Sequence, residues 1–263
     1  MHAFLYLMRF LLLFLCCLAL FACSTVPYTG RSQFLTMSEN AEFRLGLEAA
    51  REILSKEPVE RGTARAVRVE QVGERIAKAA NRLDFQWTFY TIDKPVLNAF
   101  CLPGGKVFVY TKLIELTYKN DAELAAVMGH EIAHAIARHG AERASQAQVL
   151  SLGGILLGLG VGVATGSSAV GQTAQSGYGA LAQLGILLPY SRHQETEADY
   201  IGIILAAKAG YDPRSAITFW KKMAQESKSG KEPPALLSTH PLTETRIADL
   251  ERIMPEALKY YRP

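Results

Sequence analysis

The chain has 263 residues, of which 49% are apolar and 20% charged, and its formal net charge is +3. This ordinary globular composition allows one sizeable domain or two small ones. A charge so close to neutral, without a block of Lys and Arg, argues against a nucleic-acid-binding protein.

The first 22 residues are predicted to be a targeting signal and not part of the fold. A nearly unbroken apolar run follows a single Arg and ends in Leu-Phe-Ala-Cys at residues 20–23, which resembles the lipobox of bacterial lipoprotein signals. The implied product begins at a lipidated Cys23, and Ser24 after it favours the outer membrane of a Gram-negative cell. The run is also long enough to be an uncleaved membrane anchor. Either interpretation tethers the rest of the chain to a membrane from the extracytoplasmic side.

Cys101 is the one cysteine beyond the signal and the lipidation site. A lone cysteine cannot form an internal disulfide, so the compartment cannot be deduced from disulfides. The residues around it do not suggest a thiol nucleophile. We therefore interpret Cys101 as a small buried apolar residue.

The middle of the chain is predicted to combine helices with a small sheet. Residues 24–37 are expected to be an irregular linker, and 39–56 and 64–83 to be amphipathic helices. In the second helix, apolar residues share one face: Val69, Val72, Ile76 and Ala80. A β-rich run at 85–93 predicts a strand, and 96–116 predicts a strand, a Pro-Gly-Gly turn, a strand and a helix. Two or three strands among helices indicate an α+β fold that is mainly helical.

Asn120 is predicted to cap a helix that runs from Asp121 through His139 and on toward Leu150, with Glu123 as the reciprocal cap. Further helices are expected at 193–209, from Asp212-Pro213 through Ser227, and at 241–254.

Residues 149–190 lie between these helices and contain no charged side chain. Two apolar stretches flank a middle rich in Gly, Ser, Ala and Gln, and the first stretch is shorter than the ~20 residues of a spanning helix. Three interpretations remain open: a buried helical pair, a membrane-contacting hairpin, or a mobile cover over a site.

The helix after Asn120 carries an H-E-x-x-H motif formed by His130, Glu131 and His134. Histidines four residues apart project from the same helix face, so both imidazoles can bind one tetrahedral zinc ion. Zinc polarises a scissile carbonyl and lowers the pKa of water toward ~7. Glu131 can then take a proton from that water and pass it to the leaving amine. The pattern indicates a zinc hydrolase.

A catalytic zinc needs a third protein ligand, and two sources are available. His139 is near in sequence, but it is rotated away from the face of His130 and His134, so we expect it at the surface. The alternative is a later helix on which Glu195 and Asp199 share a face. One of these carboxylates can ligate the metal while the other holds a ligating histidine by its second ring N–H. Glu197 between them is expected to point elsewhere.

These motifs resemble the HtpX-like, Ste-type zinc metallopeptidases, a family of gluzincins in which E-x-x-x-D follows H-E-x-x-H after a variable hairpin. The resemblance spans most of residues 25–255 and is greatest to the mitochondrial overlapping-activity protease subgroup and to bacterial periplasmic lipoproteins. It rests on three further stretches: "NAFCLPGGKVFVY" at 98–110, "SRHQETEADYIG" at 191–202 and "STHPLTETRI" at 238–247.

The resemblance implies a zincin-type metallopeptidase domain over residues 38–263 with one zinc ion per chain. Its metal ligands would be His130, His134 and Glu195, and Glu131 would be the catalytic base. Asp199 would not bind the metal but would hold a ligating histidine.

Further roles are implied for residues outside the two motifs. A substrate strand would add to an edge formed by Asn98, Ala99 and Phe100. His240 matches a histidine that can block the open zinc position, or it is structural in a His-Pro turn. Arg246 would stabilise the oxyanion or position a carboxylate.

The implied function is a membrane-tethered zinc endopeptidase that acts on misfolded or unassembled envelope proteins from the periplasmic side. Its expected partners are polypeptide substrates, a membrane reached through the lipid anchor and an envelope assembly machinery, but no nucleic acid. The alternative is a chaperone-like assembly lipoprotein that uses the same cleft with little proteolysis. A purely structural zinc protein is disfavoured, because structural sites close all four zinc positions, often with cysteines.

Overall fold

The computed structural model describes residues 23–118, 120–146, 148–149, 190–229, 234–242 and 245–262. The predicted signal at 1–22 lies outside the described residues, as does the uncharged 149–190 segment apart from its two end residues. Among the helices that the structure describes, none is both long and apolar enough to cross a membrane.

The chain divides into two compact units, Met1–Ser38 with Gly140–Ile186 and Glu39–His139 with Leu187–Pro263. The described part of the first unit contains an antiparallel pair of strands, β1 (Cys23–Thr25) and β2 (Ser32–Phe34). The prediction of an irregular linker at 24–37 was therefore wrong. Strands of three residues are too short to show an alternating pattern in sequence.

An ion pair and side-chain hydrogen bonds hold the hairpin within its own unit. Arg31 donates two hydrogen bonds to the carboxylate of Glu142, at 2.6 and 2.8 Å. The backbone N–H of Thr36 donates to Ser145 Oγ at 2.9 Å. The hairpin is thus tied to the helical residues after position 140.

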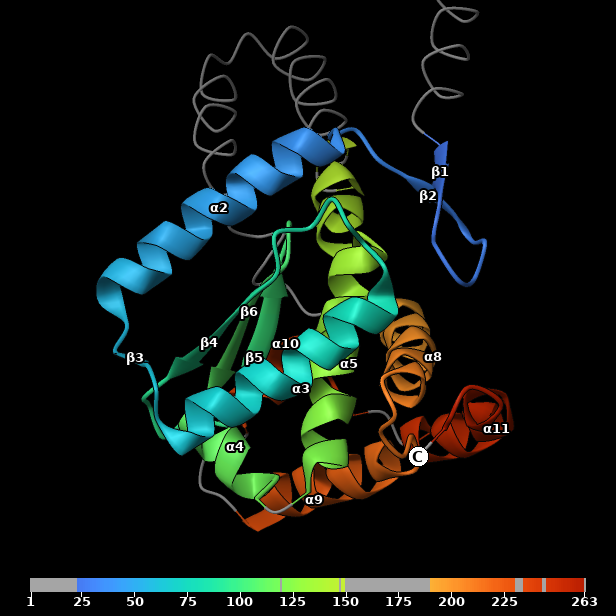
Figure 1. Ribbon diagram of the computed structural model, residues 1–263. Coiled ribbons are helices and arrows are strands. Elements are labelled where there is room, and N and C mark those ends of the chain that lie inside the picture. The colour runs from blue at the N-terminus through green and yellow to red at the C-terminus, as the bar shows by residue number, and fades with distance from the viewer. Residues whose placement is uncertain are drawn as a thin grey trace, which may run out of the picture. The chain divides into compact units, whose positions relative to one another are not determined.

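The second unit contains a four-stranded sheet whose order is β3-β4-β6-β5 (Figure 1). Its strands are β3 (Val59–Glu60), β4 (Thr88–Ile92), β5 (Ala99–Leu102) and β6 (Lys106–Tyr110). The β4 and β6 strands are parallel, and the other two pairs are antiparallel. The strands predicted within 85–93 and 96–110 are confirmed, and the two-residue β3 was not predicted.

Helices cover both faces of this sheet. Helix α2 (Glu39–Lys56) packs Ala50 against Ile92, Leu102 and Phe108 on one face. Helix α3 (Ala64–Ala80) covers the other face, where a Cβ on Gly73 would lie 2.3 Å from the ring of Phe89. The predicted apolar face of α3 is confirmed, since the four residues named for it are all buried.

The motif helix follows the short α4 (Thr111–Leu116) and is α5 (Asp121–Ile136). The side chain of Asn120 caps α5 by accepting from the N–H of Glu123, as predicted. The reciprocal cap is absent, because the Glu123 carboxylate instead accepts from Lys222 at 2.6 Å. The helix was also predicted to continue through His139. It ends at Ile136, and Arg138 has a φ of 57° before the chain becomes helical again at residue 139.

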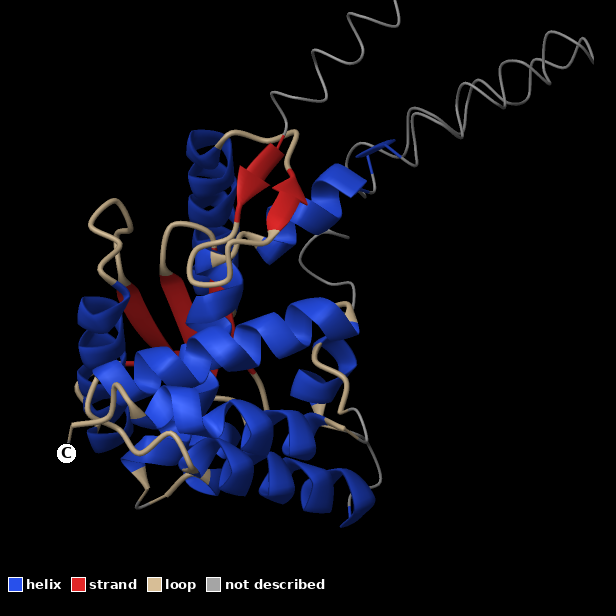
Figure 2. Ribbon diagram, turned by 90° about the vertical axis from the view of Figure 1, so that its right-hand side faces the viewer, coloured by secondary structure: helices blue, strands red, loops and turns tan. Residues whose placement is uncertain are grey.

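The remaining helices are α8 (Arg192–Lys208), α9 (Ser215–Ser229), α10 (Ala235–Thr239) and α11 (Arg246–Leu258). Helix α8 matches the prediction to within one residue at each end, and Ser191 and Gln194 form its capping box. Helix α11 begins five residues later than expected, and α10 was not predicted. The fold is mainly helical with small sheets, as the sequence indicated (Figure 2).

Candidate metal centre

Two glycines allow α5 and α8 to cross closely enough to form one site. A Cβ on Gly129 would lie 2.8 Å from the carbonyl oxygen of Gly202, and a Cβ on Gly202 would lie 2.8 Å from the backbone N of His130. Real Cβ atoms do not approach so closely, so any larger residue would push the helices apart. The close crossing places the H-E-x-x-H face of α5 against the E-x-x-x-D face of α8.

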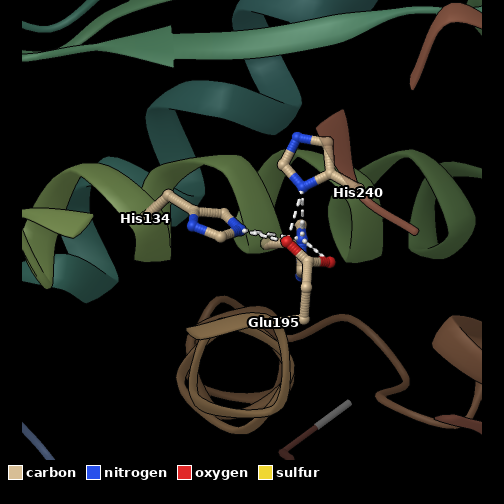
Figure 3. A group of neighbouring side chains, drawn as sticks. His134, Glu195 and His240 are labelled. Atoms are coloured by element: carbon tan, nitrogen blue, oxygen red, sulfur yellow. Dashed lines mark hydrogen bonds and ion pairs between the residues drawn. The ribbon is translucent and has the colours of Figure 1, made fainter. Parts of the chain in front are cut away.

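Four potential ligand atoms meet at this crossing, all within 4.8 Å of one another. They belong to His130, His134, Glu195 and His240, all of which are buried. Figure 3 shows His134 from α5, Glu195 from α8 and His240 from the end of α10 pointing toward a common centre. The three residues predicted as zinc ligands are therefore brought together, and His240 joins them.

The spacing of these atoms suits a small tetrahedral cation. The Nε2 atoms of His130 and His134 are 3.0 Å apart, and His134 Nε2 is 3.3 Å from Glu195 Oε1. His240 Nδ1 is 3.2 Å from His130 Nε2 and 3.0 Å from Glu195 Oε1. Ligand atoms bound to zinc at ~2.0–2.1 Å in a tetrahedron are about 3.3 Å from one another. The residues present thus fit a divalent cation.

The charges of the site support the same conclusion. Burial lowers the pKa of His134 well below its ordinary value, so this imidazole is neutral, as a ligand must be. Burial also disfavours a proton on His130, but Glu195 and Asp199 outweigh it and raise its pKa to about 9. Burial would raise the pKa of Glu195, and the charge of His130 lowers it instead. The buried carboxylates thus favour positive charge at this position, which a divalent cation would supply.

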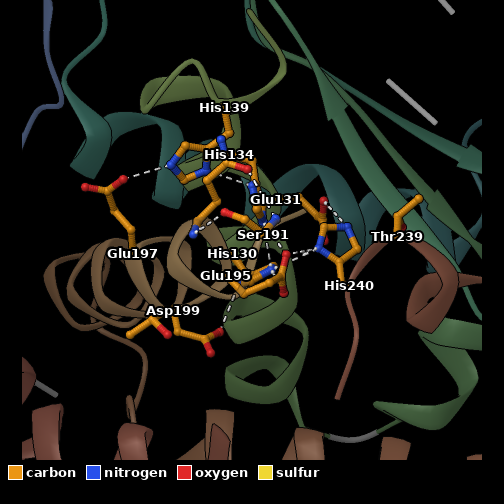
Figure 4. Close-up of polar contacts among 12 residues, drawn as sticks. His130, Glu131, His134, His139, Ser191, Glu195, Glu197, Asp199, Thr239 and His240 are labelled. Atoms are coloured by element: carbon orange, nitrogen blue, oxygen red, sulfur yellow. Dashed lines mark hydrogen bonds and ion pairs between the residues drawn. The ribbon is translucent and has the colours of Figure 1, made fainter. Parts of the chain in front are cut away.

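Asp199 contacts the ligating face of α5 through His130 (Figure 4), and Arg246 contacts Asp199 in turn. Asp199 Oδ1 is 2.9 Å from His130 Nδ1, which leaves Nε2 of that ring to face the other ligand atoms. Arg246 donates two hydrogen bonds to Asp199, both at 2.8 Å, and its Nη1 is 3.0 Å from Glu195 Oε2. The guanidinium also stacks on Trp220, 3.4 Å from the ring centroid. Of the two roles considered for Arg246, these contacts favour the positioning of carboxylates.

Glu131 lies beside the ligand atoms but is not one of the group. Its side chain is buried, and its Oε1 has no hydrogen-bond partner among the described residues. Burial raises the pKa of this carboxyl group above its ordinary value. An unpartnered buried carboxylate oxygen next to a metal site is suited to accept a proton from a reacting water.

His240 is held against the site by the backbone around it. Its Nε2 lies 3.5 Å from Glu131 Oε2, while its Nδ1 belongs to the ligand group. The carbonyl of Thr239 accepts a hydrogen bond from the N–H of Tyr190 at 2.9 Å. The ring of Tyr190 stacks on His134 with the centroids 3.8 Å apart. With His240 in this place, the protein would offer four ligands to a bound metal.

His139 lies away from the ligand group, as expected, but the prediction that it is a surface residue was wrong. It is completely buried, with Nδ1 2.9 Å from His134 Nδ1 and Nε2 3.0 Å from Glu197 Oε2. The break after α5 explains the difference, because it turns His139 back toward His134. Glu197 points away from the ligand atoms, as predicted, and toward His139 (Figure 4).

The residues predicted to form a substrate-binding edge lie at the start of β5: Asn98, Ala99 and Phe100. In the sheet as described, β5 is an end strand that pairs with β6, and α5 packs against it. The N–H of Leu236 donates to the carbonyl of Leu97 at 3.0 Å. The segment that carries His240 therefore also contacts the beginning of this edge.

Cys101, expected to be buried, is partly exposed in β5. Burial of its sulfur region and the nearby charge of Glu131 raise the pKa of the thiol, so it stays protonated. The structure gives it no role in the site.

The chain is similar in sequence to known metallopeptidases. The sequence profile described as peptidase family M48 matches residues 63–254. The chain is 37% identical over 238 residues to the mitochondrial metalloendopeptidase OMA1 of Schizosaccharomyces pombe, covering 88% of this chain and 66% of that protein. It is 32% identical over 253 residues to the protein of the same name from Saccharomyces cerevisiae, covering 89% and 70%.

A bacterial protein is related to the chain at a comparable level of sequence identity. The beta-barrel assembly-enhancing protease of Escherichia coli is 32% identical over 232 residues, covering 86% of this chain and 46% of that protein. The chain thus spans about half to two thirds of the length of most of the curated relatives that it matches.

Proposed function

The chain belongs to peptidase family M48, and from that membership we propose that it is a zinc-dependent endopeptidase tethered to a membrane. Its substrates are misfolded or unassembled proteins of a bacterial cell envelope, reached from the periplasmic side of the outer membrane. The names of these relatives support proteolysis, and one of them refers to β-barrel assembly. The lipobox-like residues 20–23 support the tether.

One observation carries the proposed chemistry: three buried candidate ligands from two helices converge beside Glu131, whose Oε1 has no hydrogen-bond partner in the described part of the chain. His130, His134 and Glu195 would hold the zinc, which is the ligand set of a catalytic site with room for one more ligand. Zinc bound there would polarise the substrate carbonyl and make water acidic enough to react at neutral pH.

The chain's own residues account for the movement of the proton. Glu131 accepts a proton from the attacking water through its free Oε1 and then delivers it to the leaving amine. Asp199 fixes His130 through Nδ1, and Arg246 fixes Asp199 in turn. The edge of β5 would align an extended substrate by backbone hydrogen bonds.

Isolation of the full chain from cell membranes tests this function and the tether together. We expect the membrane fraction to contain the protein with about one zinc ion per chain and to cleave casein. A chelator should abolish cleavage, and added zinc should restore it. Cleavage that survives complete removal of zinc would contradict the proposed chemistry, and a chain found only in the soluble fraction would contradict the tether.

The alternative function is a chaperone-like assembly lipoprotein with little proteolysis. The placement of His240 among the ligand atoms favours it, because a metal with four protein ligands leaves no position for substrate. It predicts that the chain retains zinc but does not cleave casein, even when His240 is removed.

We expect the substitution His240→Ala to increase casein cleavage. In the structure His240 Nδ1 occupies the position that a substrate carbonyl or water needs, so its loss opens the fourth position. If about 99% of the molecules rest in this arrangement, the increase reaches ~100-fold. Initial cleavage rates at matched zinc content measure it, with His193→Ala as the control, since His193 is exposed on α8. An unchanged or lower rate would show that His240 does not inhibit.

A further inference from the structure

His139 and Glu197 form a buried chain of contacts that ends at His134, and the mechanism above does not use them. His139 is completely buried, and Glu197 is 5% exposed. Resting on the proposed function of His134 as a zinc ligand, we propose that His139 is a positioning residue for the metal. It fixes the orientation and the tautomer of His134, and Glu197 fixes His139.

The distances leave one consistent arrangement of protons. His134 Nε2 faces the ligand atoms, 3.3 Å from Glu195 Oε1, so this nitrogen would give its electron pair to a bound metal. Its proton is then on Nδ1, which is 2.9 Å from His139 Nδ1 and donates to it. The proton of neutral His139 is on Nε2 and is donated to Glu197 Oε2 at 3.0 Å.

The two histidines of the motif are thus supported in different ways. His130 reaches its carboxylate directly, with 2.9 Å between Nδ1 and Asp199 Oδ1. His134 reaches a carboxylate through a second imidazole. Both carboxylates come from α8, so the helix that supplies the third candidate ligand also holds the first two. A ligating histidine commonly donates its other N–H to such a partner, which raises its basicity.

The break after α5 is what makes this contact reachable. In a continuous helix His139 would lie five residues beyond His134 and about 140° around the axis. Instead, Arg138 adopts a φ of 57°, which is uncommon for a residue other than glycine. Arg138 Nε donates to Glu42 Oε1 at 2.9 Å, and Glu42 is a buried residue of α2. The strained residue is therefore held by an ion pair from a helix far away in sequence.

Zinc affinity of the full chain tests the inference, measured by competition with a chelator of known affinity. His139→Ala is expected to weaken zinc binding by about 10–100-fold. His139→Asn should recover much of this loss, because its Oδ1 can stand near the former Nδ1 and accept the same N–H. The exposed His193 on the same helix as Glu197 provides the matched control, His193→Ala, with wild-type affinity expected.

Glu197→Gln shows whether Glu197 acts through His139. It should weaken zinc binding in the wild-type background and have no further effect in the His139→Ala background, since coupled residues are not additive. The absorption spectrum of the cobalt-substituted protein should shift in His139→Ala and return toward that of the wild type in His139→Asn.

A merely structural role would give different results. The thermal unfolding temperature of the zinc-free protein would then fall in all three variants, while zinc affinity stayed unchanged. His139→Asn would not restore the unfolding temperature lost in His139→Ala. Unchanged affinity in His139→Ala, or additive effects of His139→Ala and Glu197→Gln, overturns the inference even if the wild type binds zinc and cleaves casein. A wild type that binds no zinc overturns the proposed function first, and this inference with it.

Discussion

Replacing Glu131 with Gln is expected to lower casein cleavage by about 10²–10⁴-fold while zinc stays bound, which is the contribution typical of a general base. Glu131 lies outside the group of ligand atoms, so its loss leaves the candidate ligands intact. The amide of Gln has nearly the same shape as the carboxylate but cannot take a proton from water. Zinc stoichiometry and initial cleavage rates, measured on the same preparations, separate the loss of chemistry from the loss of metal.

A matched control excludes a general effect of losing one negative charge. Glu251 is an exposed residue of α11, and Glu251→Gln should retain both zinc and wild-type cleavage. Equal cleavage by Glu131→Gln and the wild type would remove Glu131 from the catalytic role. Loss of zinc from Glu131→Gln would instead show that this carboxylate helps to hold the metal.

Much of the fold could be predicted because its signals are local. The helix expected at 39–56 is observed with the same bounds, since its amphipathic pattern lies within the segment itself. The turn between β5 and β6 could be predicted from its two consecutive glycines. Gly104 and Gly105 both have positive φ, which glycine adopts without strain. The predicted cap Asn120 fixed the beginning of α5, one of the two helices that form the site.

The surroundings of His134 could not be read from sequence in the same way. The break that buries His139 depends on Arg138, which is held by a residue 96 positions earlier, Glu42. Tyr190, which stacks on His134, lies more than fifty residues from it and belongs to no recognisable motif. A pattern in one helix cannot reveal a partner that the tertiary fold supplies. A third histidine so close to H-E-x-x-H was the one available signal, and the assumption of a continuous helix hid it.

Arg246 shows the limit of inference from a motif. The resemblance allowed two roles, and the sequence could not decide between them. The structure places the guanidinium group against Asp199 and Glu195 and over the ring of Trp220. These contacts join α11, which carries Arg246, to α8 and α9, so the choice depended on packing that no single segment encodes.

Replacing Glu195 with Gln is expected to weaken zinc binding more than the substitution of any residue that only supports a ligand. The substitution removes the only negative charge among the four grouped residues, and a neutral amide is a poorer ligand for zinc. Loss of an outer partner costs about 10–100-fold in metal affinity, so Glu195→Gln should exceed that range. Cleavage should fall with the bound zinc. Chelator competition and zinc content at equal protein concentration provide the measurement.

Glu251→Gln is the matched control, because it makes the same chemical change at an exposed position of α11, and it should bind zinc like the wild type. Arg246 keeps both of its hydrogen bonds to Asp199 when Glu195 changes, which favours correct folding of the variant. If Glu195→Gln bound zinc like the wild type while His139→Ala lost the metal completely, the third ligand would be the nearby histidine after all. The expected order, with the largest loss at Glu195 and a smaller one at His139, instead requires a site divided between two helices. In such a site, the close crossing at Gly129 and Gly202 is as necessary for metal binding as the ligands themselves.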